Sequence, residues 1–205
     1  MTIKEQLLTG RSAAKRADSI ASLRLDIFRE YPYLYDGNRE DELDYLQMYA
    51  KKPGAFVVEV TESGTIVGAA TGIPLCHETE ELIKPFSDSS YSIEEIFYVG
   101  ELLFYPAYRN LGLGKRLITR IEQHVRSLGK YRYLLCATIV RSDSHPSCPA
   151  GYLPIDSFLA RTGFSKLVGI TTNLSWREID GIKQDHAMQF WLKPLSQVII
   201  KDENR

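Results

Sequence analysis

Residues 104–114 read FYPAYRNLGLG, and they are the most informative segment of the chain. An aromatic, apolar run stops at Pro106, a short turn follows, and Gly112 and Gly114 open a segment with helical periodicity. The first amides of a helix have no acceptor within it, and the helix dipole places partial positive charge there. Glycine has no Cβ to hold an anion away from the main chain. The stretch therefore predicts a strand, a turn and a helix N-terminus that bind phosphate; the alternative is a plain glycine turn that only starts a helix.

Two familiar phosphate loops do not fit these residues. A Walker A loop requires glycine five residues before its Gly-Lys pair and Ser or Thr after it, but Arg109 and Arg116 occupy those positions. The dinucleotide fingerprint G-x-G-x-x-G fails because Leu117 stands at the third glycine. Arg109 instead adds a fixed charge with bidentate geometry, which suits a pyrophosphate held mainly by main-chain donors.

The composition is that of an ordinary soluble globular protein. The chain has 205 residues, 44% hydrophobic and 25% charged, with a formal net charge of −1 and three cysteines. The chain is not strongly basic, as a duplex-DNA binder would be, and no apolar run approaches the ~20 residues of a membrane span. The sparse cysteines and the lack of an apolar leader favour a cytoplasmic protein that binds neither nucleic acid nor membrane.

Helical and strand-like segments alternate around the central stretch. Apolar spacing of three and four residues predicts helices over 13–30, 39–51, 113–128 and 155–162. β-rich runs predict strands over 55–61, 65–73, 97–105, 134–140, 164–176 and 187–193. No strand is evident before residue 11, and residues 74–95 and 141–154 resemble loops. Helices inserted between strands predict a single layered α/β (α+β) domain over residues 1–205.

With its flanks, the central stretch resembles the signature of the GNAT (Gcn5-related) N-acetyltransferase superfamily. Arg109, Gly112 and Gly114 match its Q/R-x-x-G-x-G/A motif, and Pro106 stands where a proline usually precedes it. Residues 158–164, FLARTGF, are similar to the family's closing aromatic helix that ends in Gly-Phe. The resemblance implies the GNAT fold: a central mixed, mostly antiparallel sheet, splayed between its fourth and fifth strands and flanked by helices.

The resemblance also implies acetyl-CoA as acyl donor, bound in the split between strands 97–105 and 134–140. Main-chain groups of the motif strand would pair with the pantetheine arm: Leu103, Phe104 and Tyr105. Main-chain amides of the turn would hold the pyrophosphate: Arg109, Asn110, Leu111, Gly112, Leu113, Gly114 and Lys115. Lys or Arg at positions 109, 115, 116, 120, 126, 130 and 132, against one acid, form either a patch that attracts CoA phosphates or a solvated helix face.

Glu101 is the candidate general base. The family's reaction is direct attack of an amine on the thioester, which requires a group to take the amine's proton. Glu101 lies in the apolar motif strand, where many members carry an acid, and desolvation would raise its pKa toward useful basicity. The alternative is a Glu101 that points outward or pairs with an arginine. Leu159 replaces the tyrosine that often protonates the leaving thiolate. Either the thiolate needs no dedicated acid or another hydroxyl supplies the proton, and Tyr152 is the nearest tyrosine in sequence.

Two loops are candidates for the acceptor pocket. The family builds this pocket between its first two helices, where Tyr31, Tyr33 and Tyr35 would supply aromatic walls. Arg141 and His145, in the long loop after the fifth strand, would bind a substrate carboxylate or relay a proton, or else belong to a proline-stiffened lid. His145 and the nearby cysteine lack further ligands at metal-binding spacing, so no metal is expected.

These residues predict an acetyl-CoA-dependent N-acetyltransferase acting on a primary amine of a small molecule or peptide. The departure at Leu159 leaves open a catalytically inactive acyl-CoA-binding module of the same fold. A nucleotide-binding protein of another fold is disfavoured by the failed loop motifs. The late strands, within 164–193, offer an edge for a homodimer.

Overall fold

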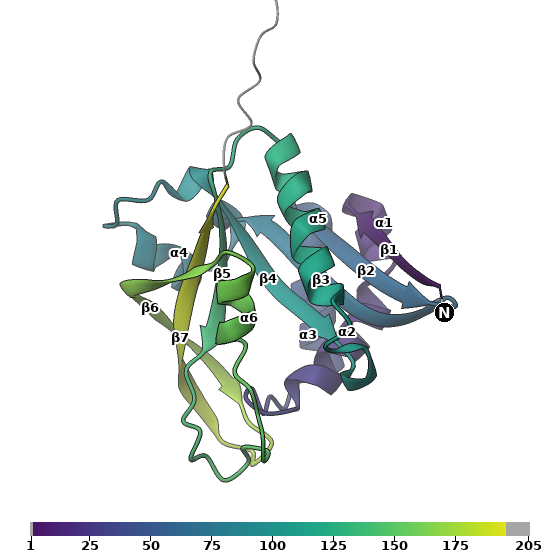
Figure 1. Cartoon of the computed structure of the whole chain (residues 1–205), viewed down its shortest axis with the longest axis vertical. Helices are drawn as coiled ribbons and strands as arrows, with labels where there is room; N and C mark the ends of the chain where they lie inside the picture. Colours follow the sequence, from purple (N-terminus) through teal and green to yellow (C-terminus); the bar gives the residue numbers. More distant parts are fainter. Residues whose placement is uncertain (1, 196–205) are drawn as a thin grey trace, which may run out of the picture.

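A computed structural model describes residues 2–195, which form a seven-stranded sheet with helices on both faces (Figure 1). In chain order the strands are β1 (Ile3–Leu8), β2 (Phe56–Glu62), β3 (Thr65–Pro74), β4 (Ile96–Phe104), β5 (Tyr133–Ile139), β6 (Ser165–Arg177) and β7 (Lys183–Pro194). The order in the sheet is β1-β2-β3-β4-β5-β7-β6. Neighbours are antiparallel except β4 and β5, which run parallel. The mixed, mostly antiparallel sheet confirms the fold class predicted from the sequence.

The helices lie in two layers. They are α1 (Gly10–Ala14), α2 (Ala17–Phe28), α3 (Arg39–Lys51), α4 (Glu80–Ile83), α5 (Leu113–Ser127) and α6 (Asp156–Arg161). One-turn 3-10 helices complete the set: η1 (Leu75–His77), η2 (Lys84–Phe86), η3 (Ile93–Glu95) and η4 (Pro106–Tyr108). α5 and α6 cover one face of the sheet, and α1, α2 and α3 cover the other (Figure 1).

Local sequence sets the ends of the main helices. α3 begins where the Asn38 side chain accepts a hydrogen bond from the Asp41 amide (3.0 Å), with acidic residues in the first turn. α5 begins after Gly112, whose φ of 77° is left-handed. The face that α5 turns to the sheet is a buried apolar stripe made of Leu113, Leu117, Ile118, Ile121 and Val125.

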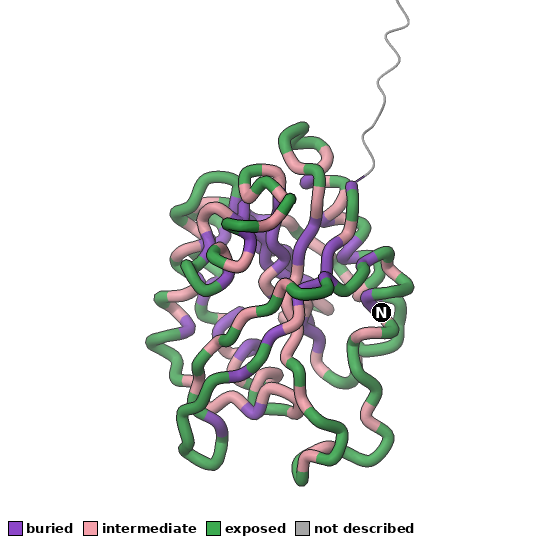
Figure 2. Tube along the Cα trace, turned by 90° about the vertical axis from the view of Figure 1, so that its left-hand side faces the viewer, coloured by how far each residue is buried: buried purple, intermediate pink, exposed green. Residues whose placement is uncertain are grey.

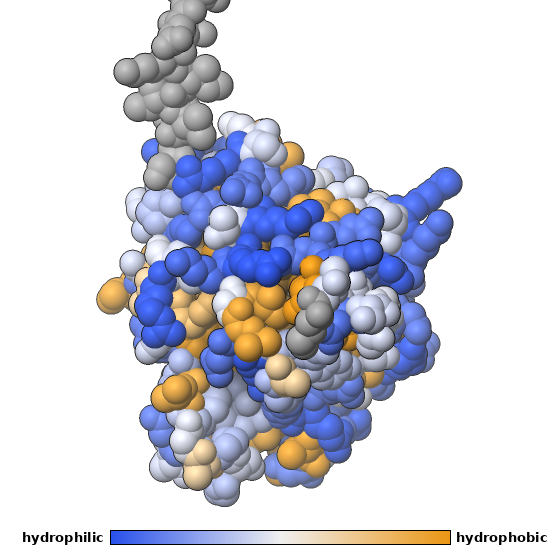
Figure 3. Space-filling view, turned by 45° about the vertical axis from the view of Figure 1, so that its right-hand side comes forward, coloured by the Kyte–Doolittle hydropathy of each residue, from blue (hydrophilic) through white to orange (hydrophobic). Residues whose placement is uncertain are grey.

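The sheet separates two hydrophobic cores. Ile96 and Tyr98 of β4 pack in the core beneath α2 and α3, whereas Phe97 and Val99 pack in the core beneath α5. This division follows from the alternation of side chains along a strand. Buried residues accordingly gather along the strands in the middle of the molecule, while loops are exposed (Figure 2). On the side seen in Figure 3, hydrophilic residues surround a central apolar area.

A β-bulge in β4 breaks this alternation. Between two regular pairs, Thr71 of β3 alone faces both Gly100 and Glu101 of β4. Regular alternation would put Glu101 on the same face as Val99. The extra residue instead turns Glu101 toward the layer of α2 and α3, the side on which Leu103 is buried.

β4 and β5 diverge after three paired positions. The pairs are Ile96–Tyr133, Phe97–Leu134 and Tyr98–Leu135. Beyond them, residues 99–104 of β4 have no partner strand on this side within the described part of the chain, which confirms the split predicted between the fourth and fifth strands. Residues 136–139 of β5, beside this split, are half-buried, whereas Leu134 and Leu135, which pair with β4, are fully buried.

Three segments differ from the sequence prediction. β1 precedes residue 11; it is an edge strand whose polar residues alternate with half-buried ones, a pattern too short and too polar to stand out. The helix expected over 13–30 is broken into α1 and α2. The loop expected over 74–95 contains η1, α4, η2 and η3. The charged tail expected at the end of the chain falls on residues 196–205, outside the described residues. Within residues 2–195, no helix combines the length and apolar character needed to cross a membrane.

Candidate active site

The turn between β4 and α5 presents main-chain amides. After η4, Asn110 and Gly112 have left-handed φ values of 60° and 77°. The Arg116 amide makes the first main-chain hydrogen bond of α5, to the Gly112 carbonyl (3.1 Å). The amides of residues 113–115 therefore have no helical acceptor and lie at the positive end of the helix dipole. An anion with several acceptor oxygens, such as a phosphate, fits this end of the helix.

The two glycines of the turn have different surroundings. A Cβ on Gly112 would meet no atom within 4 Å, so the space beside this residue is open. A Cβ on Gly114 would lie 3.2 Å from Cζ of Phe158, so Gly114 lets α6 pack closely against the start of α5. From the sequence, both glycines were predicted to let an anion approach the main chain. In the structure, Gly114 also allows α6 to pack against α5.

Arg109 lies at the end of β4 and is held there. Its Nε donates to the Phe104 carbonyl (2.9 Å), and its guanidinium pairs with Glu30 just after α2 (2.8 Å). Both charged side chains are partly exposed, Arg109 by 41% and Glu30 by 42%. Arg109 is therefore close to the turn and accessible, but an anionic ligand would compete with Glu30 for it.

Carboxylates neutralise much of the basic segment that follows. The ion pairs at or below 3.6 Å are Arg109–Glu30, Arg116–Glu5, Arg126–Glu122, Lys130–Glu94 and Arg132–Glu95. Five of the seven basic positions predicted to attract phosphates thus have acidic partners. The alternative prediction, a solvated helix face, describes these residues better, and the turn amides are the stronger anion-binding feature.

The free side of β4 offers main-chain groups to an extended ligand. On the β3 side, Leu103 and Phe104 are paired with that strand and the Tyr105 amide donates to the Val67 carbonyl (3.1 Å). The opposite side faces the split. An extended chain that carries amides can bind such an edge as an added strand. The residues present therefore fit a CoA thioester, with its pantetheine arm along β4 and its diphosphate at the turn.

Glu101 is buried, 7% exposed, and donors surround its carboxylate. Arg24 of α2 forms an ion pair with Oε1, Tyr45 of α3 donates to the same oxygen (2.8 Å), and Thr71 donates to Oε2. Glu42 of α3 forms a second ion pair with Arg24. Glu101 therefore points into the protein and pairs with an arginine, which is one of the arrangements the sequence left open.

Arg24 holds the two carboxylates in place. Its guanidinium lies 4.3 Å from the centre of the Tyr45 ring and 5.0 Å from that of Phe28, both within cation–π range. Burial by itself lowers the pKa of Arg24, but Glu101, Tyr45 and Glu42 raise it above its ordinary value, so the side chain stays charged. One guanidinium between two carboxylates leaves the group with a formal excess of negative charge when both are ionised.

The two loops predicted to form the acceptor pocket meet in the structure. The Tyr31 hydroxyl donates to the Ser142 carbonyl (3.1 Å), although the two residues are 111 positions apart. The Tyr31 ring lies 6.0 Å from His145 and edge-on to Tyr152 at 4.7 Å, measured between ring centres. Tyr31, His145 and Tyr152 thus form one surface.

Tyr33 and Tyr35 connect this surface to its neighbours. Burial raises the pKa of Tyr33, and nearby Tyr152 and Glu101 raise it further. Tyr33 therefore lies within electrostatic reach of both Tyr152 and the Glu101 group. Tyr35 forms a main-chain bridge with Glu178, which fixes the loop to the end of β6. Burial and a neighbouring carboxylate raise the pKa of Tyr35 to about 12.

Arg141 belongs to a second buried polar group. It pairs with Glu178, its Nη1 lies 3.2 Å from Nε2 of His145, and its Nη2 lies 3.4 Å from Nδ1 of His186. The His186 ring stacks on Trp176, with ring centres 3.7 Å apart. Arg141 and His145 are therefore adjacent, as an acceptor-binding pair requires, but Glu178 already balances the arginine's charge.

The position of the usual tyrosine is part of the core. Leu159 of α6 is 3% exposed and packs with the residues beneath α5. Tyr152, in the preceding loop, is half-buried, and burial raises its pKa above the ordinary value. Its hydroxyl therefore keeps its proton at neutral pH.

Sequence reasoning missed the partners of Glu101 and Arg141. They lie on elements distant in the chain, and no local motif connects them: Arg24, Glu42, Tyr45, Thr71, Glu178 and His186. One signal was available. Tyr45 and Tyr49 are four residues apart in α3, which puts two hydroxyls on the same side of a helix that packs against the sheet.

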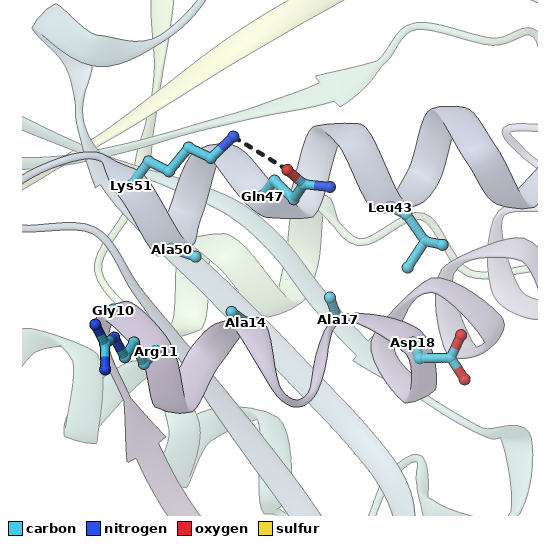
Figure 4. Close-up of a pocket in the computed structure, with 9 residues that line it drawn as sticks. All are labelled: Gly10, Arg11, Ala14, Ala17, Asp18, Leu43, Gln47, Ala50 and Lys51. Atoms are coloured by element: carbon cyan, nitrogen blue, oxygen red, sulfur yellow. Dashed lines mark hydrogen bonds between the residues drawn. The ribbon is translucent and has the colours of Figure 1, made fainter.

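A groove of about 490 Å³ lies elsewhere, between α3 and the α1–α2 segment (Figure 4). Its lining is made of Gly10, Arg11, Ala14, Ala17, Asp18, Leu43, Gln47, Ala50 and Lys51. None of the residues predicted for catalysis or binding is among them. Across residues 2–195, no three His, Cys, Asp or Glu side chains are grouped so that they could hold a metal ion.

Comparison with known families identifies the class of protein. The sequence matches the acetyltransferase (GNAT) family over residues 19–150, a segment that contains the turn, Glu101 and most of the loop after β5. The chain belongs to this family. A comparison with curated protein sequences gave no match.

Solved structures share the fold at low sequence identity. An N-acetyltransferase of Staphylococcus aureus Mu50 is 12% identical, with a TM-score of 0.61 over 95% of this chain and 99% of that one. The ribosomal-protein-alanine N-acetyltransferase of Brucella melitensis is 14% identical, with a TM-score of 0.60 over 95% and 100%. The yncA protein of Salmonella typhimurium, whose structure contains its cofactor acetyl-CoA, is 14% identical, with a TM-score of 0.59 over 100% of both chains. These likenesses show that this chain has the same fold.

Proposed function

We propose that this protein transfers an acetyl group from acetyl-CoA to a primary amine of a small molecule or peptide, by direct attack in a ternary complex. One observation carries the proposal: β4 joins a buried carboxylate at position 101, an open main-chain edge over 99–104 and, just beyond its end, a turn with free amides. Membership of the acetyltransferase family supports acetyl transfer as the reaction.

The donor would be held by main-chain groups. The edge formed by Leu103, Phe104 and Tyr105 would pair with the pantetheine arm, and the amides of residues 109–115 would bind the pyrophosphate. Arg109, partly exposed beside the turn, would exchange Glu30 for a phosphate. When bound, acetyl-CoA supplies a thioester carbonyl that an amine can attack.

Glu101 would take the proton of the acceptor amine. An aliphatic amine is almost fully protonated at neutral pH, so it must lose a proton before it can attack. Donors from Arg24, Tyr45 and Thr71 hold both oxygens of the carboxylate, so its orientation is fixed before the amine arrives. The formal negative excess of the Glu101, Glu42 and Arg24 group favours a cationic acceptor.

The surface formed by the two loops would bind the acceptor and supply the proton for the leaving thiolate. Tyr152 would protonate the thiolate, since its raised pKa keeps the hydroxyl protonated. Its contact with Tyr31 connects this role to the acceptor wall. The wall would comprise the residues predicted from the sequence, Tyr31, Tyr33, Tyr35, Arg141 and His145.

The test measures thiol release and CoA binding separately. Wild-type protein is expected to release CoA thiol from acetyl-CoA in the presence of at least one member of an amine panel. Glu101→Gln should slow this release by ~100-fold or more while calorimetry shows unchanged CoA affinity. Glu59→Gln is the control, because Glu59 is also buried and ion-paired, with Arg16, but lies on β2. Equal rates in wild type and Glu101→Gln would remove Glu101 from the mechanism.

A second candidate is a catalytically inactive acyl-CoA-binding module. The observation that favours it is Leu159, a core residue where the family often has its tyrosine acid. This function predicts CoA binding by calorimetry without thiol release for any amine.

The proposal extends to the organisation of the protein. A single acetyltransferase domain over residues 1–205 is supported by the one sheet that includes strands from β1 to β7. The free cysteines at 76, 136 and 148 suit a cytoplasmic protein. β6, the last strand of the sheet, would supply the edge of a homodimer, which sedimentation analysis can test.

A further inference from the structure

Glu101 is the end of a chain of hydrogen-bonded oxygens that crosses the layer beneath α3. From Oε1 of Glu101 to the Tyr45 hydroxyl is 2.8 Å, and from Tyr45 to the Tyr49 hydroxyl is 2.8 Å. From Tyr49 to Oε1 of Glu78 is 3.2 Å. Two carboxyl groups are thus joined by two tyrosines that stand one turn apart on α3.

The bulge in β4 makes room for this chain. A Cβ on Gly100 would lie 2.6 Å from the Tyr49 hydroxyl and 2.7 Å from Oγ1 of Thr71. Any side chain at this position would displace the hydroxyls. Gly100 therefore both belongs to the bulge that turns Glu101 inward and leaves the space in which the tyrosines meet.

The chain of hydrogen-bonded oxygens needs one proton for each of its hydrogen bonds. Three hydrogen bonds in a row need three protons, but Tyr45 and Tyr49 supply one each. The third must come from Glu101 or Glu78, so the complete chain holds one carboxylic acid and one carboxylate. Each phenol can pass on its proton as it receives another, so the extra proton can lie at either end without a charged tyrosine.

The two ends differ in their surroundings. Glu101 faces Arg24 and accepts from Thr71, so a cation and a hydroxyl donor lie beside its carboxylate. Glu78 accepts from the Thr79 amide (3.2 Å), and burial raises its pKa to about 7. The ionisable groups that face Glu78 come from α2, α3 and β4: Arg24, Tyr45, Tyr49, Tyr98 and Glu101.

We propose that Tyr45 and Tyr49 relay the amine proton from Glu101 to Glu78, which releases it to solvent. The proposal rests on the proposed function. The N–H bond of the acceptor ammonium breaks and an O–H bond forms on Glu101. When Glu78 is ionised, Glu101 passes this proton to Tyr45, Tyr45 passes its own to Tyr49, and Tyr49 passes its own to Glu78, which restores the Glu101 carboxylate and both phenols. Glu78, 8% exposed, loses the proton to water, so the step is balanced without a further reactant.

The kinetic test uses the pH dependence of thiol release with a saturating amine. In wild type, the rate is expected to rise through an apparent pKa of about 7, well below the titration of the amine itself near 10. In Glu78→Gln and Tyr49→Phe, this inflection should be lost and the rate should fall about tenfold. Added imidazole buffer should restore part of the lost rate. Tyr98→Phe is the matched control, since it removes a neighbouring buried hydroxyl that is not a member of the chain.

A second measurement does not depend on activity. The infrared band of a buried protonated carboxylic acid should be present in the free protein at about pH 6 and lost at about pH 8. Glu78→Gln should abolish the band, and Glu59→Gln should leave it unchanged. Tyr45→Phe serves as a second break in the chain if thermal denaturation shows Tyr49→Phe to be poorly folded.

The outcomes separate the relay from the reaction. If wild type releases thiol but Glu78→Gln and the tyrosine variants keep its rate and its inflection, the relay is overturned and the proposed function stands. If wild type releases no thiol with any amine, the proposed function fails and the catalytic role of the relay fails with it. Loss of the inflection together with loss of the infrared band supports the relay.

Discussion

The turn before α5 and the buried group around Glu101 adjoin the same strand but are built in opposite ways. The turn uses main-chain amides of consecutive residues, is exposed, and leaves its donors open. The Glu101 group uses side chains from four elements, is buried, and satisfies every carboxylate oxygen of Glu101. A site made of open main-chain donors binds a ligand, whereas a saturated side-chain group holds charge and protons in a fixed arrangement. The two regions should therefore respond to different perturbations.

The largest effect is expected from removing the cation of the buried group. Arg24→Met would leave Glu42 and Glu101 without their common partner and should lower the free energy of unfolding by about 3–5 kcal/mol. Arg29→Met is the control: its pair with Asp36 is 61% and 30% exposed, so the loss should stay below about 1 kcal/mol. Chemical denaturation measures both. Similar losses in the two variants would contradict the contrast drawn between the buried group and exposed pairs.

The next effect concerns the pH dependence of stability. The folded-state pKa of Glu78 is raised to about 7, above its ordinary value of 4.5, so folding favours the protonated form. The resulting stabilisation is fully present below about pH 4.5 and is lost as the pH rises through about 7, a change on the order of 3 kcal/mol.

Glu78→Gln should remove this dependence. Relative to wild type, the variant is expected to gain stability between about pH 5 and pH 8, as followed by thermal denaturation at both values. The control variant Glu59→Gln should show no such gain in stability between the two pH values. A Glu78→Gln protein whose stability curve runs parallel to that of wild type would show that Glu78 titrates normally.

A smaller effect is expected at the turn, where ligand binding should weaken and stability should fall modestly. A Cβ at position 112 would meet no atom within 4 Å, but valine there must adopt a φ of 77°, which costs about 1–2 kcal/mol. Relief of this strain would shift the turn amides away from the phosphate, so CoA binding should weaken roughly tenfold. Gly64→Val is the matched control, with a φ of 88° and equally open space in the β2–β3 hairpin. Calorimetry of Gly64→Val should show the same CoA affinity as the wild type. Unchanged affinity in Gly112→Val would argue against the turn as the anion site.

The smallest effect on stability is expected at Arg109. Its pair with Glu30 is about two-fifths exposed on both sides, so Arg109→Met should change the free energy of unfolding by less than about 1 kcal/mol. CoA affinity should fall a few-fold, and the difference from wild type should shrink as salt is added, because screening weakens exposed charges. A difference that is independent of salt would assign Arg109 a packing role instead.

The same contrast explains what could be predicted from the sequence. The turn was predictable because the residues that build it are neighbours in the chain, and hydrophobic spacing fixed α3, α5 and the β2–β3 hairpin for the same reason. The partners of Glu101 were not, because they come from positions 24, 45 and 71, and no spacing rule connects these. Regular alternation points Glu101 to the wrong face because of the bulge at Gly100. A lone glycine within a strand is a known mark of a bulge, but it does not show which side chain the bulge turns inward.

The two loops show most clearly which contacts cannot be predicted from the sequence. Tyr31, His145 and Tyr152 were each singled out for chemistry, but their meeting depends on a contact between loops 111 residues apart in the chain. Local pattern identifies such residues as polar or aromatic and exposed. Only the folded sheet determines which of them face one another.

The early divergence of β4 from β5 also has a consequence for solubility. Unpaired strand edges act as templates for other chains, and proteins commonly protect them with charges, prolines or covering loops. Here the unpaired edge over residues 99–104 lies between two strands of one sheet rather than at its border. An extended ligand can enter the split and pair with this edge, whereas another protein's strand would have less room between β4 and β5 than beside a border strand, so the unpaired backbone is less exposed to other chains.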